Sequence, residues 1–146
     1  MSGKDFGEVV NLIVKEDSRF DRDAYFFLRH GLDHTLNKVK EKEESDQLRH
    51  VTGQELCEGI REYAIEQFGP MTMTLMETWG LRKTADFGEM VFNLVEYGVF
   101  GKTESDRKED FEDVYDFDGA FAQPFRPKKA RLATSEAVIE RSEAGT

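Results

Sequence analysis

The sequence predicts a mainly α-helical fold, a compact domain of about five helices. Two observations predict it. Apolar residues recur at steps of three and four along several segments, which places them on one face of a helix. Capping residues, glycines and prolines stand where those segments should begin and end. We expect a single helical domain over residues 1–125, in which residues 84–125 form a helix followed by an aromatic and acidic segment, and a mobile basic tail over residues 126–146.

The N-terminal third contains two expected helices. Residues 5–14 form a short one, and residues 21–42 form a longer one after a charged turn. Residues 38–50, KVKEKEESDQLRH, have almost no apolar content, so we expect the second helix to fray there into a solvated connector. The face that this helix turns to the core consists of Tyr25, Leu28, Leu32, Leu36 and Val39.

A capping box opens the third expected helix. In Thr52-Gly53-Gln54-Glu55 the threonine hydroxyl accepts the amide hydrogen of the third helical residue, and the glutamate reaches back to the amide of the cap. The helix therefore begins at Gly53. Gly69 ends it, and Pro70 suits the first turn of the next helix, where no amide donor is needed. The apolar stripe consists of Leu56, Ile60, Tyr63, Ala64 and Phe68.

Glycines at expected helix ends predict two further helices. Residues 71–79 form a short helix closed by Gly80. A last helix, capped by Thr84 or Asp86, reaches about Tyr97, where Gly98 stands at the terminating position. Its expected inward residues are Phe87, Met90, Val91 and Leu94.

The chain after Gly98 allows two interpretations. Residues 99–117 contain a short apolar run, a polar turn and the strand-favouring FEDVYDF, which is typical of a small β-hairpin. Short helices followed by a hairpin are also the order of elements in a winged-helix module. Alternatively, Asp116 caps a last helical turn through Phe121, and Pro124 ends regular structure.

The stretch from Thr84 to Phe125 carries the expected function. It holds seven of the twelve phenylalanines of the chain, interleaved with acids instead of glycines and bases. We expect most of these rings to pack on the helices and one or two to stay accessible within an apolar patch rimmed by acids, as in protein interfaces. The candidate partner-binding residues are Phe100, Phe111, Tyr115, Phe117, Phe121, Phe125, Asp113 and Asp116.

Charge restricts the partners. The net charge is -10, and residues 1–125 carry 15 Lys and Arg against 27 Asp and Glu, which is -12 and leaves +2 for the tail. An acidic body opposes contact with phosphates, so nucleic-acid binding is expected only through the tail, and a basic protein surface is the favoured partner. The basic residues of the tail are clustered at Arg126, Lys128, Lys129 and Arg131.

The number of cysteines and the lack of long apolar runs indicate the cellular compartment. Cys57 is the single cysteine and cannot form an internal bridge, which indicates a reducing cytoplasm and a buried structural thiol. No apolar run resembles a signal peptide or is long enough to span a bilayer. We therefore expect a cytoplasmic protein without membrane insertion.

No catalytic constellation emerges, and the sequence indicates no cofactor. The Asp-Phe-Gly triplets beginning at Asp5 and Asp86 lack the other motifs of a protein kinase. Residues 116–119, DFDG, resemble the middle of a calcium loop but lack the first and the twelfth ligand. His30 and His34 are candidate metal ligands because they stand one helical turn apart, yet they lie away from the expected core face and no third ligand is fixed.

The sequence resembles a family of short acidic bacterial proteins. The motifs that carry the resemblance are GQELCEGIREYAIEQFG at residues 53–69, DFGEMVFNLVEYG at residues 86–98 and YDFDGAFAQPF at residues 115–125. The family is uncharacterised, so the resemblance implies no activity, cofactor or site residue.

These observations favour a non-enzymatic protein-interaction or regulatory module whose acidic surface docks a basic protein partner. Two alternatives stay open. One is a winged-helix-like transcription- or RNA-associated factor that binds through its tail, and the other is a histidine-based metal-binding protein. The sequence does not indicate an oligomeric state.

Overall fold

A computed structural model describes residues 5–43, 51–100 and 107–127. Its described part is mainly helical, with five α-helices, and this confirms the predicted fold class. The helices are α1 (Phe6–Glu16), α2 (Arg22–Glu43), α3 (Gly53–Phe68), α4 (Thr72–Thr78) and α5 (Thr84–Glu96). Short single turns complete the chain: η1 (Gly69–Met71), η2 (Lys108–Phe111), the π-helical η3 (Asp118–Ala122) and η4 (Gln123–Phe125).

The predicted capping signals set most of the helix ends. Asp5 caps α1, its carboxylate accepting the amide hydrogen of Glu8 at 2.8 Å. Thr52 and Glu55 form the reciprocal capping box of α3. Gly69, Gly80 and Gly98 all have positive φ and end or follow helices as expected.

The start of α5 differs from the prediction by one residue. Lys83 occupies the N-cap position, so neither Thr84 nor Asp86 does. The Asp86 carboxylate instead reaches back from the first turn and accepts the amide hydrogens of Arg82 and Lys83. The Thr84 hydroxyl does not cap the helix and instead contacts the C-terminal segment.

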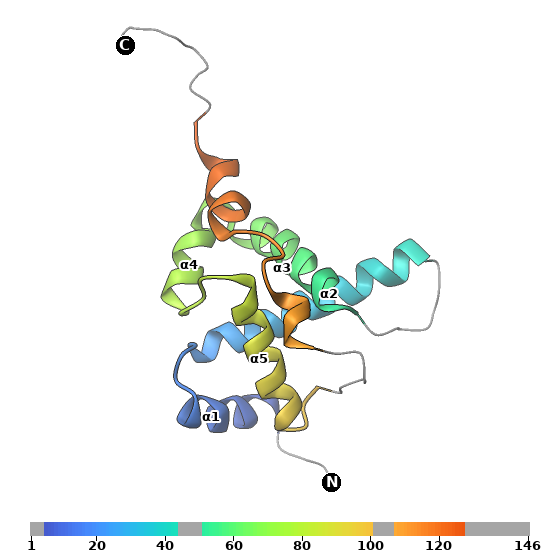
Figure 1. Ribbon diagram of the computed structural model, residues 1–146, viewed down its shortest axis with the longest axis vertical. Helices are drawn as coiled ribbons and strands as arrows, with labels where there is room; N and C mark the ends of the chain where they lie inside the picture. The colour runs from blue at the N-terminus through green and yellow to red at the C-terminus, as the bar shows by residue number, and fades with distance from the viewer. Residues whose placement is uncertain (1–4, 44–50, 101–106, 128–146) are drawn as a thin grey trace, which may run out of the picture.

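Helix α2 spans Arg22–Glu43, within one residue of the predicted helix over residues 21–42, and its turns from Lys38 to Glu43 are helical, so the expected fraying does not begin at Lys38. The rest of that connector, residues 44–50, lies outside the described residues. Tyr25 and Leu28 of the predicted stripe are fully buried, whereas Leu32, Leu36 and Val39 are only half-buried. The reason is visible in Figure 1, where the last turns of α2 extend past α3 and leave the helical body.

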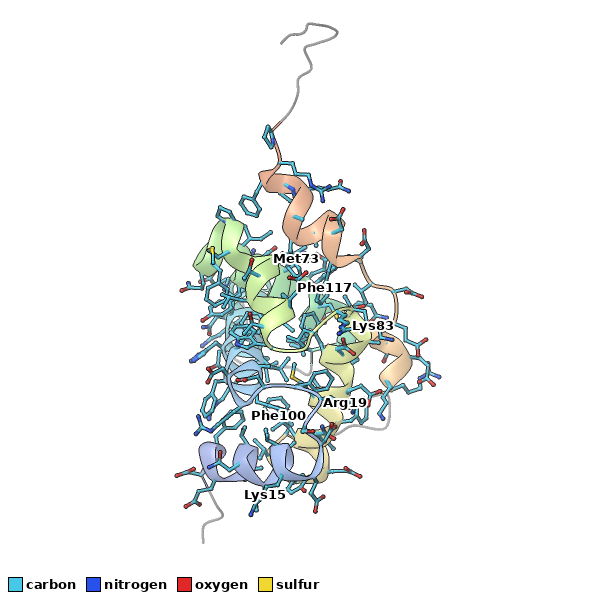
Figure 2. The ribbon with its side chains drawn as sticks, turned by 90° about the vertical axis from the view of Figure 1, so that its left-hand side faces the viewer. Lys15, Arg19, Met73, Lys83, Phe100 and Phe117 are labelled. Atoms are coloured by element: carbon cyan, nitrogen blue, oxygen red, sulfur yellow. The ribbon has the colours of Figure 1, made fainter. Side chains whose placement is uncertain are left out.

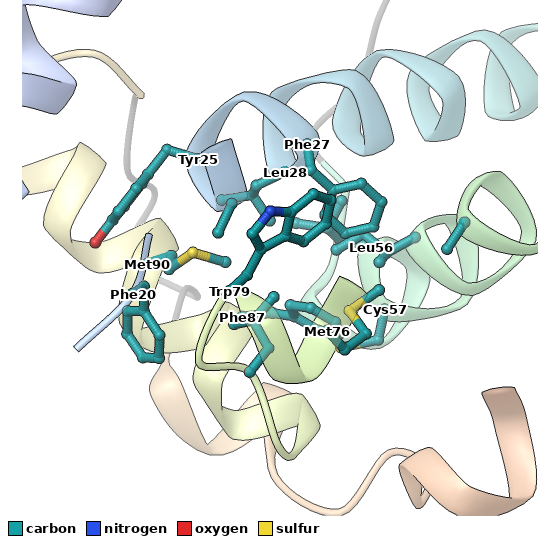
Figure 3. Close-up of a cluster of buried hydrophobic side chains, with 14 of the residues drawn as sticks. Phe20, Tyr25, Phe27, Leu28, Leu56, Cys57, Met76, Trp79, Phe87 and Met90 are labelled. Carbon is teal, nitrogen blue, oxygen red and sulfur yellow. The ribbon is translucent and has the colours of Figure 1, made fainter. Parts of the chain in front are cut away.

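The core lies where α2, α3, α4 and α5 meet (Figure 3). Aromatic rings fill its centre: Phe27 of α2 lies 5.1 Å from Trp79 and 5.9 Å from Phe68, centroid to centroid. Helix α1 closes the lower side in Figure 1 and contacts α2 and α5. The fully buried large side chains are Tyr25, Phe87, Phe121, Ile13, Leu28, Ile60, Met76, Leu81, Met90, Leu94 and Val10.

The described part of the predicted hairpin contains no β-strand. Residues 107–117 contain the turn η2 and no strand, while residues 101–106 lie outside the described residues. The Asp116 carboxylate accepts the amide hydrogens of Asp118 and Gly119, and a helical turn follows, so the alternative of a last turn capped by Asp116 is confirmed. The buried aromatic side chains of residues 107–127 pack inward on helices.

Candidate functional site

Residues 107–127, which we call the C-terminal strap, run along α5, α3 and α4 (Figure 1). Phe111 is the first anchor and is 5% exposed. Its ring fits between two helix glycines, since a β-carbon on Gly88 of α5 would lie 2.9 Å from Phe111, and one on Gly53 of α3 would lie 3.0 Å from it. Only residues without a side chain leave room for the ring at this crossing.

The Thr84 hydroxyl fastens the backbone of the strap. It donates a hydrogen bond of 2.6 Å to the Phe111 carbonyl oxygen and accepts the Val114 amide hydrogen at 3.2 Å. Thr84 is 1% exposed, so both of its bonds are made in a dry environment where an unpaired group would be costly. Sequence reasoning assigned Thr84 only a possible capping role, because a contact across 27 residues leaves no local signal.

Tyr115 is the second anchor. Its hydroxyl donates to the Cys57 carbonyl oxygen at 2.7 Å. Burial raises the pKa of Tyr115, and burial likewise raises the pKa of the Cys57 thiol to about 12. The thiol is completely buried, which confirms its predicted structural role and keeps it from acting as a nucleophile in the folded protein.

Phe117 and Phe121 form the third anchor. Their centroids are 5.0 Å apart, and Phe117 also lies 5.6 Å from Phe87 of α5. Phe117 is 4% exposed and Phe121 is fully buried. Together with Phe111 these rings belong to the core, so the prediction that all three are exposed binding residues was wrong. Phe117 also lines a cavity beside α4.

The remaining candidates are at least partly accessible. Phe100 and Tyr115 are half-buried, Asp113 and Asp116 are exposed, and Phe125 is 38% exposed. The expectation that most of the aromatic residues pack on the helices while one or two stay accessible is confirmed by these values.

An acidic face lies outside the aromatic anchors. Glu109, Glu112 and Asp113 are exposed, and Asp113 adopts a positive φ of 51°, a conformation that aspartate tolerates better than most residues. Asp118 binds Arg126 at 2.7 Å, and hydrogen bonds from Gln123 and Arg126 lower the pKa of Asp118. The alternation of aromatic and acidic residues along the sequence therefore gives the strap an aromatic inner side and an acidic outer side.

Two large apolar side chains are exposed at one end of the molecule. Met71 in η1 is 57% exposed, and Phe125 in η4 is 38% exposed. Figures 1 and 2 both place the turn before α4 and the end of the strap at the same end of the molecule.

A cavity of about 380 Å³ separates α4 from the strap. Met73, Leu81 and Phe117 supply its apolar lining, and Met73 and Phe117 lie near each other in Figure 2. Glu77 and Arg82 add one charge of each sign. The cavity resembles the surface depressions that receive an anchoring side chain of a protein partner.

The candidate metal ligands, His30 and His34, lie on α2 and face Tyr63 of α3. His30 is exposed and His34 is half-buried, with their ring centroids 6.3 Å and 5.8 Å from the ring of Tyr63. The Nε2 atom of His34 is 3.5 Å from a carboxylate oxygen of Glu62. Within residues 5–43, 51–100 and 107–127, no group of three or more His, Cys, Asp or Glu side chains is placed to hold a metal ion.

The basic cluster of the tail is described only in part. Arg126 is described and pairs with Asp118, while Lys128, Lys129 and Arg131 of the basic cluster lie outside the described residues. None of the described helices is long and apolar enough to cross a membrane.

Comparisons with known proteins add no relative. No family model, no curated protein and no solved structure matches this chain. Its function is therefore argued from its own residues.

Proposed function

We propose that the protein is a non-enzymatic interaction module whose C-terminal strap docks a basic surface of a partner protein. The observation that carries this proposal is the two-sided strap. Its rings are fixed in the core, so its outer carboxylates stand on a backbone that is ordered before a partner arrives.

Preorganisation supports binding because a partner need not order the segment that it contacts. The carboxylates of Glu109, Glu112 and Asp113 are exposed along this backbone. Exposed charges of one sign steer a partner of the opposite sign and raise the association rate. They also make the interaction sensitive to salt.

Apolar contacts complete the surface. Interfaces combine a charged rim with a few large anchors. Met71 and the strap residue Phe125 are exposed, and the cavity lined by Met73 and Phe117 is open to an incoming side chain. The proposed partner thus presents lysine or arginine around one or two apolar residues. A cytoplasmic location agrees with the free buried thiol of Cys57.

Affinity capture from the source cells, at low and at moderate salt, tests the proposal. The expected result is a stoichiometric protein partner of basic charge. Binding of the purified partner is then measured by calorimetry with the wild type and with Glu109→Lys/Glu112→Lys, which should weaken binding at least about tenfold because like charges now meet.

The matched control is Glu41→Lys/Glu66→Lys, which makes the same change in net charge at exposed positions of α2 and α3. It should bind the partner like the wild type. Recovery of the chain alone at both salt concentrations would refute the proposal, and so would equal loss of binding in both variants.

A further inference from the structure

A second cavity of about 490 Å³ opens between the C-terminal half of α2 and the N-terminal half of α3. The two helices touch tightly at one point below it, where a β-carbon on Gly59 would overlap the side chain of Thr35. Beyond that point α2 extends away from the body (Figure 1), and the groove lies between the two helices. This groove is separate from the strap.

The groove is lined by one stripe from each helix. Thr35, Lys38, Val39 and Lys42 come from α2, and Glu55, Glu58, Gly59 and Glu62 come from α3, together with the adjacent Gln54. Both sets follow the spacing i, i+3 or i+4, i+7, which is the spacing that a helix presents to a partner helix. Small and apolar residues form the floor, a basic rim lies along α2, and an acidic rim lies along α3.

The rims already show one matched contact inside the chain. Lys38 Nζ lies 2.8 Å from Glu62 Oε1, and hydrogen bonding to Lys38 lowers the pKa of Glu62. Lys42 lies one helical turn after Lys38, and Glu58 lies one helical turn before Glu62, so these two residues also stand opposite each other across the groove. Among the described ion pairs, Glu58 binds Arg61 of its own helix at 3.1 Å, an exposed contact of small energy.

We propose that this groove binds the same groove of a second copy of the chain, forming a four-helix, two-fold symmetric dimer. A two-fold contact requires a surface that is complementary to itself. A basic rim beside an acidic rim meets this requirement when α2 of one copy lies over α3 of the other. The contacting helices then run antiparallel, and Lys42 of one copy faces Glu58 of its partner on each side of the two-fold axis.

The opposite arrangement, α2 over α2, is disfavoured because it sets lysine against lysine and glutamate against glutamate. Charge complementarity therefore selects both the partner and its orientation. The apolar floor is limited to Val39, Thr35 and Gly59, so the dimer is expected to be weak and to depend on salt.

Sedimentation velocity tests the proposal with the full chain at concentrations up to about 200 µM, where weak association is visible. We expect dimers in about 20 mM salt and mostly monomers in about 500 mM salt. Lys42→Glu and Glu58→Lys should each be monomeric alone, because each variant places like charges at both contacts. An equimolar mixture of the two should dimerise again, because both contacts are then attractive.

Lys40→Glu is the matched control, since it makes the same charge change on α2 at an exposed position turned away from the groove. It should dimerise like the wild type. A wild type that is monomeric at all concentrations in low salt overturns the proposal. Failure of the mixture to restore the dimer, or a Lys40→Glu variant as monomeric as Lys42→Glu, overturns it as well.

Discussion

The ring of Phe111 lies against the bare α-carbon of Gly88, where an added methyl group would come within 2.9 Å of three carbon atoms of Phe111. Gly88 belongs to α5, and Phe111 belongs to a segment that returns after residues 101–106. A glycine inside helix α5 thus leaves the space in which the first ring of the C-terminal strap packs.

Gly88→Ala should destabilise the protein despite the better helix propensity of alanine. Propensity favours alanine by about 1 kcal/mol, whereas overpacking against a ring that is fixed on its other side costs about 1–3 kcal/mol. We expect a net loss of about 1 kcal/mol in the free energy of unfolding, measured by urea denaturation. Gly7→Ala is the control: its β-carbon would lie 3.3 Å from the flexible end of Arg22, so this variant should be as stable as the wild type or more so. Equal gains in both variants would contradict the role of Gly88.

Phe121→Ala should lower the free energy of unfolding by about 3–5 kcal/mol, because Phe121 is fully buried and its removal leaves a cavity. Phe125→Ala, the same change at a ring that is 38% exposed, should cost less than about 1 kcal/mol. Thermal unfolding followed by circular dichroism distinguishes the two. A Phe121→Ala variant as stable as Phe125→Ala would mean that the strap is detachable from the helical body.

Cys57 makes stability fall in mildly alkaline solution. Burial raises the pKa of its thiol to about 12, above the value near 8.5 expected in the unfolded chain. The stability that the buried neutral thiol contributes is therefore complete below about pH 8.5. As the pH rises from there towards 12, the free energy of unfolding falls by about 1.4 kcal/mol per pH unit. Urea denaturation at about pH 8, 9 and 10 should show this slope in the wild type and a smaller one in Cys57→Ala. Identical slopes would show that the thiol is accessible in the folded protein.

Asp17 contributes stability that acid removes. Hydrogen bonds from Arg19 and Asn93 hold the pKa of Asp17 well below its usual range, with Arg19 the larger cause. The stability that the Asp17 carboxylate contributes is fully present above the pKa of aspartate in the unfolded chain, about 3.9. It is lost as the pH falls below that pKa towards the lower pKa of Asp17 in the folded protein. Asp17→Asn should lower stability at pH 7 and flatten the fall in stability between about pH 4 and 2. Asp33→Asn, which removes an exposed carboxylate of α2, controls for net charge; an effect as large as that of Asp17→Asn would contradict the assignment.

Local signals were enough to locate the helices. The Asp5 cap, the Thr52–Glu55 capping box and the glycines at positions 69, 80 and 98 act over a single turn, so their consequences can be read from neighbouring residues. The apolar period of α3 and α5 identified Leu56, Ile60, Phe87, Met90 and Leu94 as core residues, and all five are buried. The burial of Cys57 followed in the same way from its place beside Leu56.

The tertiary structure decided what the aromatic segment does. Alternation of rings and acids is compatible with a hairpin, a docking surface or a packed strap, and the choice depends on whether two helices leave a space that fits a ring. Gly53 and Gly88 provide that space only because α3 and α5 meet there, and Thr84 reaches Phe111 across 27 residues. Such contacts are set by the packing of distant segments, which leaves no periodic trace in the sequence. The same holds for the groove between α2 and α3, whose charges become two facing rims only when the helices lie side by side.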